Sequence, residues 1–104
     1  MTFERISIIG VGLIGGSLGL ALRQTGFAGE IVGVSRDETI EQAVAIGAVD
    51  RGVDYERLDE GVGAADLVVV CSPIQHIIGI LPKVMAAVPA GALVTDAGST
   101  KRHI

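Results

Sequence analysis

The 104-residue sequence has few aromatic residues, one cysteine and no long apolar run. With one Tyr, two Phe, no Trp and a net charge of −4, it lacks the basic, aromatic-rich surface of a nucleic-acid-binding domain. The single cysteine, Cys71, excludes an internal disulfide or a cysteine zinc site and is typical of a reducing compartment. No apolar run reaches the roughly 18 residues of a membrane span, and the charged Glu4 and Arg5 precede the first apolar segment, unlike a signal peptide. We therefore expect a cytoplasmic protein with no nucleic-acid, membrane or metal partner.

Glycine and aliphatic residues, in contrast, are plentiful. The chain contains 15 glycines and is 49% hydrophobic, with a mean hydropathy of +0.57. This glycine usage is about twice the average, but it shows neither the period of collagen nor the polarity of a linker. We expect one globular domain in which the glycines serve turns and close packing.

The N-terminal part of the chain alternates between strand and helix patterns. Residues 5–10 form a β-branched run that predicts a strand, and residues 13–22 have helical spacing with little charge, which predicts a buried helix. Gly26 is typical of a residue that ends a helix, and residues 30–34 predict a second strand. A β-α-β unit is therefore expected here.

The next part of the chain is more polar. Asp37 is placed to cap a helix over residues 38–46, and Gly47 is expected to end that helix. The stretch 48–63 is the most polar in the chain and predicts a loop with one short helical turn. It carries no spacing of catalytic side chains.

Two further strands are expected in the C-terminal part. Residues 67–71 are continuously apolar, which is typical of a strand covered on both faces of a parallel sheet. A helix over about residues 75–87, kinked or divided at Pro82, leads to a strand over residues 92–95. The resulting α/β chain predicts a doubly wound parallel sheet of about four strands in the order 3-2-1-4, with a ligand-binding switch point between strands one and four. Compared with a complete six-stranded domain, we expect a truncated one with an open edge at strand four.

A glycine motif lies at the junction of the first strand and the first helix. Residues 10–15 read G-V-G-L-I-G and match the dinucleotide-binding pattern G-x-G-x-x-G. The pattern occurs readily by chance in a glycine-rich chain, so its position gives it weight. It starts at the end of a strand and opens a helix, as a Rossmann-type pyrophosphate site requires.

Each residue of this motif has an expected role. Gly10 permits the tight turn, Gly12 lets the backbone approach the pyrophosphate, and Gly15 allows close packing of helix on strand. The free N–H groups of the turn and first helical residues, with Leu13 and Ile14 among them, and the helix dipole would hold the anion. The alternative is a glycine turn that serves packing alone.

The end of the second strand bears on the choice of cofactor. An NAD-preferring domain usually places Asp or Glu about 20 residues after the motif, and this chain has Ser35 followed by Arg36. A hydroxyl and a guanidinium suit a 2′-phosphate, which favours NADP, with NAD as the alternative. In one alternative, Arg36 is a solvated charge or forms an ion pair with Asp37. In another, Asp37 is the ribose-binding acid, shifted by two positions along the chain.

The ends of the last two expected strands carry the remaining candidates. Ser72 and Pro73 are expected to line the nicotinamide side of the cleft, whereas Cys71 is interpreted as a small core residue. His76 and His103 have no neighbouring carboxylate and are not expected to be catalytic. The loop over residues 96–101 reads D-A-G-S-T-K and fits either a plain turn or a site for an anionic or hydroxylated substrate.

These segments together resemble one enzyme family. Residues 10–19 (G-V-G-L-I-G-G-S-L-G), 65–74 (A-D-L-V-V-V-C-S-P-I) and 95–101 (T-D-A-G-S-T-K) are similar to the N-terminal domain of the prephenate/arogenate dehydrogenases of tyrosine biosynthesis. The resemblance spans essentially the whole chain. It implies NADP- or NAD-dependent oxidative decarboxylation of prephenate or arogenate, an anionic substrate.

The resemblance also assigns roles to residues. Ser99 corresponds to the family's active-site serine, and Ser35 with Arg36 is similar to the pair found in NADP-using arogenate dehydrogenases. The family's catalytic histidine lies in a G-x-H-P type motif that this chain lacks, and His103 does not match it. The family's helical catalytic and dimerisation domain would also follow residue 104, so we expect a homodimer only of the full-length protein and no turnover by this chain alone.

Three alternatives remain open at this point. One is another dehydrogenase, of the 3-hydroxyacid or ketopantoate type. A second is a non-catalytic NAD(P)-binding regulatory domain, which would typically carry an acid where this chain has Ser35. A third is a fold fragment that dimerises through strand four and binds nothing. The sequence does not decide between prephenate and arogenate as the substrate. It also carries no signal for feedback by tyrosine.

Overall fold

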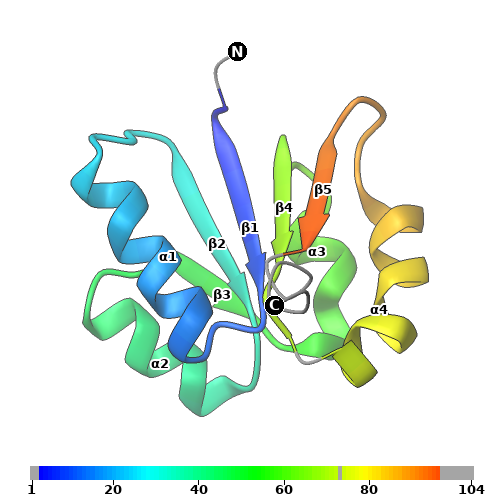
Figure 1. The fold of residues 1–104 in the computed structure, drawn as a ribbon, viewed down its shortest axis with the longest axis horizontal. Coiled ribbons are helices and arrows are strands. Elements are labelled where there is room, and N and C mark those ends of the chain that lie inside the picture. Colours follow the sequence, from blue (N-terminus) through cyan, green and yellow to red (C-terminus); the bar gives the residue numbers. More distant parts are fainter. Residues whose placement is uncertain (1–2, 73, 97–104) are drawn as a thin grey trace, which may run out of the picture.

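The computed structural model describes residues 3–72 and 74–96, and these form a parallel sheet between two layers of helices (Figure 1). The sheet has five strands in the order β3-β2-β1-β4-β5. The strands are β1 (Arg5–Ile9), β2 (Glu30–Val34), β3 (Arg51–Val53), β4 (Leu67–Val70) and β5 (Leu93–Asp96). The helices are α1 (Leu13–Gln24), α2 (Asp37–Ala45), α3 (Leu58–Val62) and α4 (Ile74–Ala87), with a 3-10 turn η1 (Tyr55–Arg57) before α3.

The core lies on both faces of the sheet. In Figure 1, α1 and α2 lie on one side of the sheet, and α3 and α4 lie on the other. Successive residues of β1 point to opposite faces, so that Ile8 joins a buried cluster with Ala43 of α2, and Ile9 joins a second cluster with Val84 of α4. Burial on both faces explains why β1, β2 and β4 are largely apolar runs without alternation.

The predicted fold class is confirmed, but the strand count and the places of the last two strands were wrong. The stretch 48–63 contains β3, which pairs with β2 at Gly33 and Gly52, and also η1 and α3. As a consequence β4, expected beside the second strand, pairs directly with β1, and β5 takes the edge beyond β4. The switch point of the sheet therefore lies between β1 and β4.

The helix ends are mostly as expected. Gly26 and Gly47 follow α1 and α2 with φ of +90° and +83°, which confirms them as helix stops. The cap of α2 differs, because Arg36 occupies the N-cap position without a side-chain hydrogen bond and Asp37 is the first helical residue. The charge of Asp37 then complements the helix dipole instead of capping an N–H group. Pro82 lies inside α4 and does not divide it.

The described residues contain neither a helix suited to a membrane nor a cluster of metal ligands. None of their helices has the length and apolar character to cross a membrane. No group of three or more His, Cys, Asp or Glu side chains within residues 3–72 and 74–96 is placed to hold a metal ion.

Candidate functional site

The turn between β1 and α1 forms the centre of the candidate site. β1 ends at Ile9, and Gly10 adopts a φ of +83°, a left-handed conformation that favours glycine. The Gly10 N–H donates to the carbonyl of Val34 at 2.7 Å, which fixes the turn to the end of β2. Because α1 begins at Leu13, the chain reverses within a few residues and brings the helix N-terminus to the carboxyl edge of the sheet.

The N-terminus of α1 is open toward solvent. Its N-cap is Gly12, which provides no side-chain cap, and its first turn contains no acidic residue. A Cβ atom added to Gly12 would meet no other heavy atom within 4 Å. The first N–H groups of a helix have no partner within the helix, and the helix dipole gives this end a partial positive charge. This arrangement is suited to an anion such as a phosphate.

Close packing holds the turn in place. A Cβ atom on Gly15 would lie 2.6 Å from the carbonyl oxygen of Gly10 and 3.1 Å from Cγ2 of Ile8, far inside van der Waals contact. The predicted packing role of Gly15 is therefore confirmed. The helix N-terminus and the end of β1 pack directly against each other because no side chain separates them.

Ser72 lies against the same turn from the neighbouring strand. It follows β4 and is 4% exposed, and its Oγ has no hydrogen-bond partner among the described residues. A Cβ atom on Gly10 would lie 2.5 Å from this oxygen and 3.0 Å from the Ser72 nitrogen. Two predicted site residues that are distant in sequence are thus in contact, and one carries a buried unpaired hydroxyl.

The end of β2 places Ser35 and Arg36 at the same edge of the sheet. Ser35 is 6% exposed, and its N–H donates to the carbonyl of Val53 at 3.1 Å. Arg36 is exposed, and its guanidinium forms no ion pair within the described part of the chain. The alternative in which Arg36 pairs with Asp37 is therefore not observed, and the guanidinium stays available to a ligand.

A groove of ≈550 Å³ lies between α1 and α2 and adjoins the glycine turn. The groove was not predicted, although Thr39, Gln42 and Ala43 lie in α2 at the spacing of three and four that marks one helix face. The lining residues are Val11, Gly12, Gly16, Thr39, Gln42, Ala43 and Ile46.

Cys71 packs among apolar residues beside the site, as the sequence predicted. Burial raises the pKa of its thiol, and the nearby carboxylate of Asp96 raises that pKa further. A thiol with a raised pKa remains protonated at neutral pH, so Cys71 is a poor nucleophile here.

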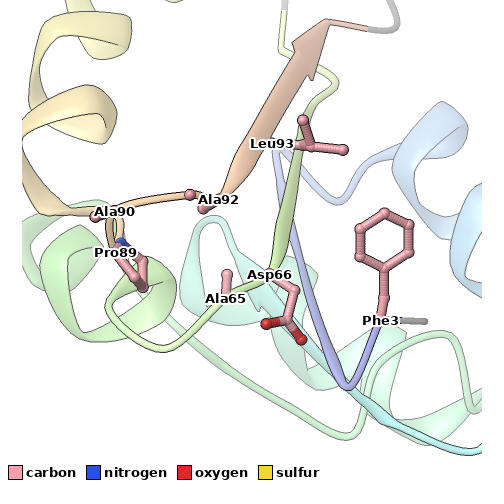
Figure 2. A pocket seen from close by; sticks show the side chains of 8 residues that line it. Phe3, Ala65, Asp66, Pro89, Ala90, Ala92 and Leu93 are labelled. Carbon is pink, nitrogen blue, oxygen red and sulfur yellow. The ribbon is translucent and has the colours of Figure 1, made fainter. Parts of the chain in front are cut away.

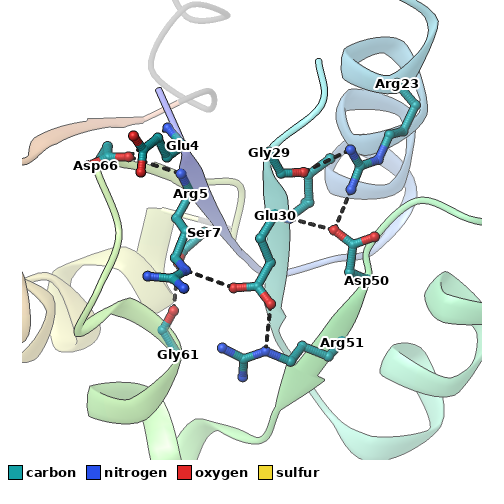
Figure 3. Close-up of polar contacts among 11 residues, drawn as sticks. Glu4, Arg5, Ser7, Arg23, Gly29, Glu30, Asp50, Arg51, Gly61 and Asp66 are labelled. Atoms are coloured by element: carbon teal, nitrogen blue, oxygen red, sulfur yellow. Dashed lines mark hydrogen bonds and ion pairs between the residues drawn. The ribbon is translucent and has the colours of Figure 1, made fainter. Parts of the chain in front are cut away.

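The opposite, amino edge of the sheet carries a polar network that the sequence analysis missed (Figure 3). The carboxylate of Asp66 accepts hydrogen bonds from the backbone N–H groups of Glu4 and Arg5, at 2.7 and 2.9 Å. The carboxylate of Asp50 accepts from the N–H of Ile31 at 2.8 Å and from the guanidinium of Arg23. Each aspartate immediately precedes a strand and accepts from backbone N–H groups near the start of the strand beside it in the sheet. This position is the only signal for them in the sequence.

A cavity of ≈210 Å³ also opens at this amino edge (Figure 2). It lies beside Asp66, between Phe3 and the segment from Pro89 to Leu93. Its lining is mainly small and apolar, and it is at the end of the sheet away from the glycine turn. It contains none of the predicted site residues.

Two predicted site residues, Pro73 and Ser99, lie outside the described residues, as does His103. The described residues therefore bring together the glycine turn and Ser72, with Ser35 and Arg36 at the same edge.

Comparisons with known proteins agree with this geometry. Residues 18–104 match the family model for the nucleotide-binding domain of prephenate dehydrogenase. The prephenate dehydrogenase of Lactococcus lactis subsp. cremoris is 35% identical over 102 residues, which cover 97% of this chain and 28% of that protein. The Bacillus subtilis prephenate dehydrogenase is 34% identical over 105 residues, covering 97% and 27%. The chain thus spans little more than a quarter of these relatives.

Solved structures show the same similarity. The prephenate dehydrogenase of A. aeolicus, in complex with hydroxyphenyl propionate and NAD+, superposes with a TM-score of 0.84 at 32% identity, over 92% of this chain and 34% of that one. The arogenate dehydrogenase of Synechocystis gives a TM-score of 0.73 at 36% identity, over 88% and 32%. This chain belongs to the prephenate dehydrogenase family and corresponds to its nucleotide-binding domain.

Proposed function

We propose that this chain is the NADP-binding part of an enzyme that oxidatively decarboxylates prephenate or arogenate in tyrosine biosynthesis. Family membership supports the reaction, and the A. aeolicus relative was solved with NAD+ and hydroxyphenyl propionate. The observation that carries the proposal is the open N-terminus of α1, held against β1 at Gly15 and left without a capping side chain at Gly12.

The residues of the turn fit a dinucleotide. The free backbone N–H groups around Gly12, Leu13 and Ile14 would hold the pyrophosphate, and the dipole of α1 would stabilise its charge. Gly10 and Gly15 keep these groups in position by allowing the turn and the close contact with β1. When bound, the nicotinamide serves as the acceptor of the substrate hydride.

The end of β2 favours NADP over NAD. An NAD site usually places a carboxylate where Ser35 lies, and a carboxylate there would repel a 2′-phosphate. Arg36 is exposed, adjacent to Ser35 and without an ion pair in the described residues, so its guanidinium is free to bind a phosphate in a planar, bidentate manner.

The remaining parts of the proposal rest on the family resemblance. Ser99 would lie beside the reacting hydroxyl of the anionic substrate. The catalytic histidine, the helical domain and the homodimer contact would belong to the remainder of a longer, cytoplasmic protein. We therefore expect this chain, taken alone, to bind nucleotide without turnover, and formation of tyrosine or hydroxyphenylpyruvate by it would contradict this.

Calorimetric titration with NADP and, separately, NAD at low salt tests the cofactor assignment. The chain is expected to bind NADP more tightly, and Arg36→Asp is expected to lose about tenfold or more of its NADP affinity, because a charge-assisted contact to the 2′-phosphate is removed. NAD affinity should change little, since NAD lacks that phosphate.

Arg51→Asp is the matched control, because it makes the same charge change at the amino edge. It should leave the ratio of NADP to NAD affinity as in the wild type. An unchanged ratio in Arg36→Asp would show that Arg36 does not contact the 2′-phosphate. Failure of the wild type to bind either nucleotide would overturn the proposed function.

A further inference from the structure

We infer that the buried hydroxyl of Ser72 is a nucleotide-positioning group, which gains its hydrogen bond only when the pyrophosphate binds. The inference rests on the proposed function and deepens it. It concerns the Oγ atom of Ser72, which lies against Gly10 although the two residues are 62 positions apart in the sequence. This oxygen makes no hydrogen bond within the described residues.

The unpaired state of this hydroxyl is unusual. Ser72 is 4% exposed, and its Oγ is the only buried side-chain nitrogen or oxygen among the described residues that has no hydrogen-bond partner. Buried polar groups in native proteins are nearly always hydrogen-bonded, because leaving one unpaired is destabilising. A buried hydroxyl without a partner therefore calls for a role outside the stability of the unbound chain.

Ser7 provides an internal comparison. It is 1% exposed, and its Oγ donates to the carbonyl oxygen of Gly61 at 2.6 Å. Both serines lie in or near the central strands, since Ser7 is in β1 and Ser72 is two residues beyond the end of β4. The fold thus satisfies the hydroxyl of Ser7, which connects a strand to a helix, and leaves the hydroxyl of Ser72 unsatisfied at the carboxyl edge.

The position of Ser72 indicates which ligand atom it meets. β1 and β4 flank the switch point of the sheet, where ligands bind beyond the carboxyl ends of the strands. The Ser72 oxygen lies against Gly10, the first residue of the turn that presents the N–H groups of α1. A phosphate oxygen held by those groups would offer an acceptor to the Ser72 hydroxyl, whose hydrogen can be directed toward it by rotation about the C–O bond.

Paired substitutions test the inference through both stability and affinity. Ser72→Ala removes an unpaired hydroxyl, so the melting temperature of the unbound chain should stay equal or rise, while the Kd for NADP should increase about 5- to 10-fold. Ser7→Ala leaves the Gly61 carbonyl unpaired, so its melting temperature should fall, and its Kd at a temperature where it is folded should match the wild type.

ADP serves as the second probe, because it carries two linked phosphates without the nicotinamide. Ser72→Ala should weaken ADP binding by the same factor as NADP binding. A loss with NADP alone would overturn the assignment to the pyrophosphate.

The remaining outcomes separate the two proposals. If the wild type binds NADP and Ser72→Ala binds it equally well, or if Ser72→Ala lowers the melting temperature as Ser7→Ala does, the inference about Ser72 is wrong and the proposed function stands. If the wild type binds neither NADP nor NAD, both fall together.

Discussion

The two edges of the sheet treat their polar groups in opposite ways. At the amino edge, carboxylates bind the backbone N–H groups that begin the strands, and Glu30 bridges Arg5 of β1 and Arg51 of β3, each at 3.0 Å (Figure 3). At the carboxyl edge, the N-terminus of α1 has no side-chain cap and the Ser72 hydroxyl has no partner in the described residues. One edge is completed by the chain itself, whereas the other has polar groups available for a ligand.

The amino edge also lowers the pKa values of its acids. Hydrogen bonds from the N–H groups of Arg5 and Glu4 lower the pKa of Asp66 below its ordinary value of 3.8. Hydrogen bonds from Arg51 and Arg5, opposed by partial burial, lower the pKa of Glu30 below 4.5. These carboxylates are therefore ionised at neutral pH, and their interactions favour the folded state.

The largest effect is expected from a methyl group in the glycine turn. Gly15→Ala places a Cβ 2.6 Å from the Gly10 carbonyl oxygen, so α1 must move away from β1. We expect a loss of about 1–3 kcal/mol in the free energy of unfolding and a loss of NADP binding beyond detection. Urea denaturation and calorimetry measure the two quantities.

Gly16→Ala is the matched control one residue further along α1. A Cβ there meets nothing within 4 Å, so the variant should retain NADP binding and gain about 0.5–1 kcal/mol from its better helix propensity. Equal effects of the two substitutions would show that contact with β1 is not what makes Gly15 necessary.

A smaller effect, confined to stability, is expected at the amino edge. Asp66→Asn should lower the melting temperature at neutral pH without changing nucleotide affinity, because the charged acceptor of two N–H groups is weakened. Since the folded-state pKa of Asp66 is depressed, its contribution is complete above the unfolded value and is lost as the pH falls through the folded value. The difference between wild type and variant should thus shrink below about pH 3.8. A constant difference down to pH 2 would mean that the charge is irrelevant.

The smallest effect is expected from Glu30→Gln. The side chains of Arg5, Arg51 and Glu30 are 52%, 53% and 31% exposed, so solvent screens both ion pairs. The free energy of unfolding should fall by under about 1 kcal/mol, and the difference should diminish in 1 M salt. A larger, salt-independent loss would show that Glu30 acts through packing and not through its charge.

Much of the fold was predictable because long apolar runs and glycine stops are local signals. β3 was missed because it is only three residues long and reads R-G-V, too short to show a strand period. It pairs with β2 and packs closely against α2, where a Cβ on Gly52 would lie 2.4 Å from Cδ1 of Ile40, and both contacts join residues that are distant in the sequence. Because β3 was not predicted, the strand over residues 67–71 was expected beside β2, whereas β4 pairs with β1.

The candidate site was predictable in its parts and not in its assembly. The glycine motif and the pair Ser35 and Arg36 are visible in the sequence because their neighbours along the chain define them. The contact between Gly10 and Ser72 depends on β1 lying next to β4, and the missing hydrogen bond of Ser72 depends on everything packed around it. No local pattern encodes either property.

The pairing of β1 with β4 also determines when the site exists during synthesis of the chain. The strand, turn and helix of the glycine motif are complete after Gln24, but their neighbour β4 is translated much later, and Arg5 and Asp66 are joined across 61 residues. Such long-range pairings close late, because a large loop must be ordered before the contact forms. In an emerging chain, the glycine turn is therefore expected to lack Ser72 until β4 pairs with β1. Nucleotide binding would then report the completed topology of the sheet, which the helical content of the chain does not.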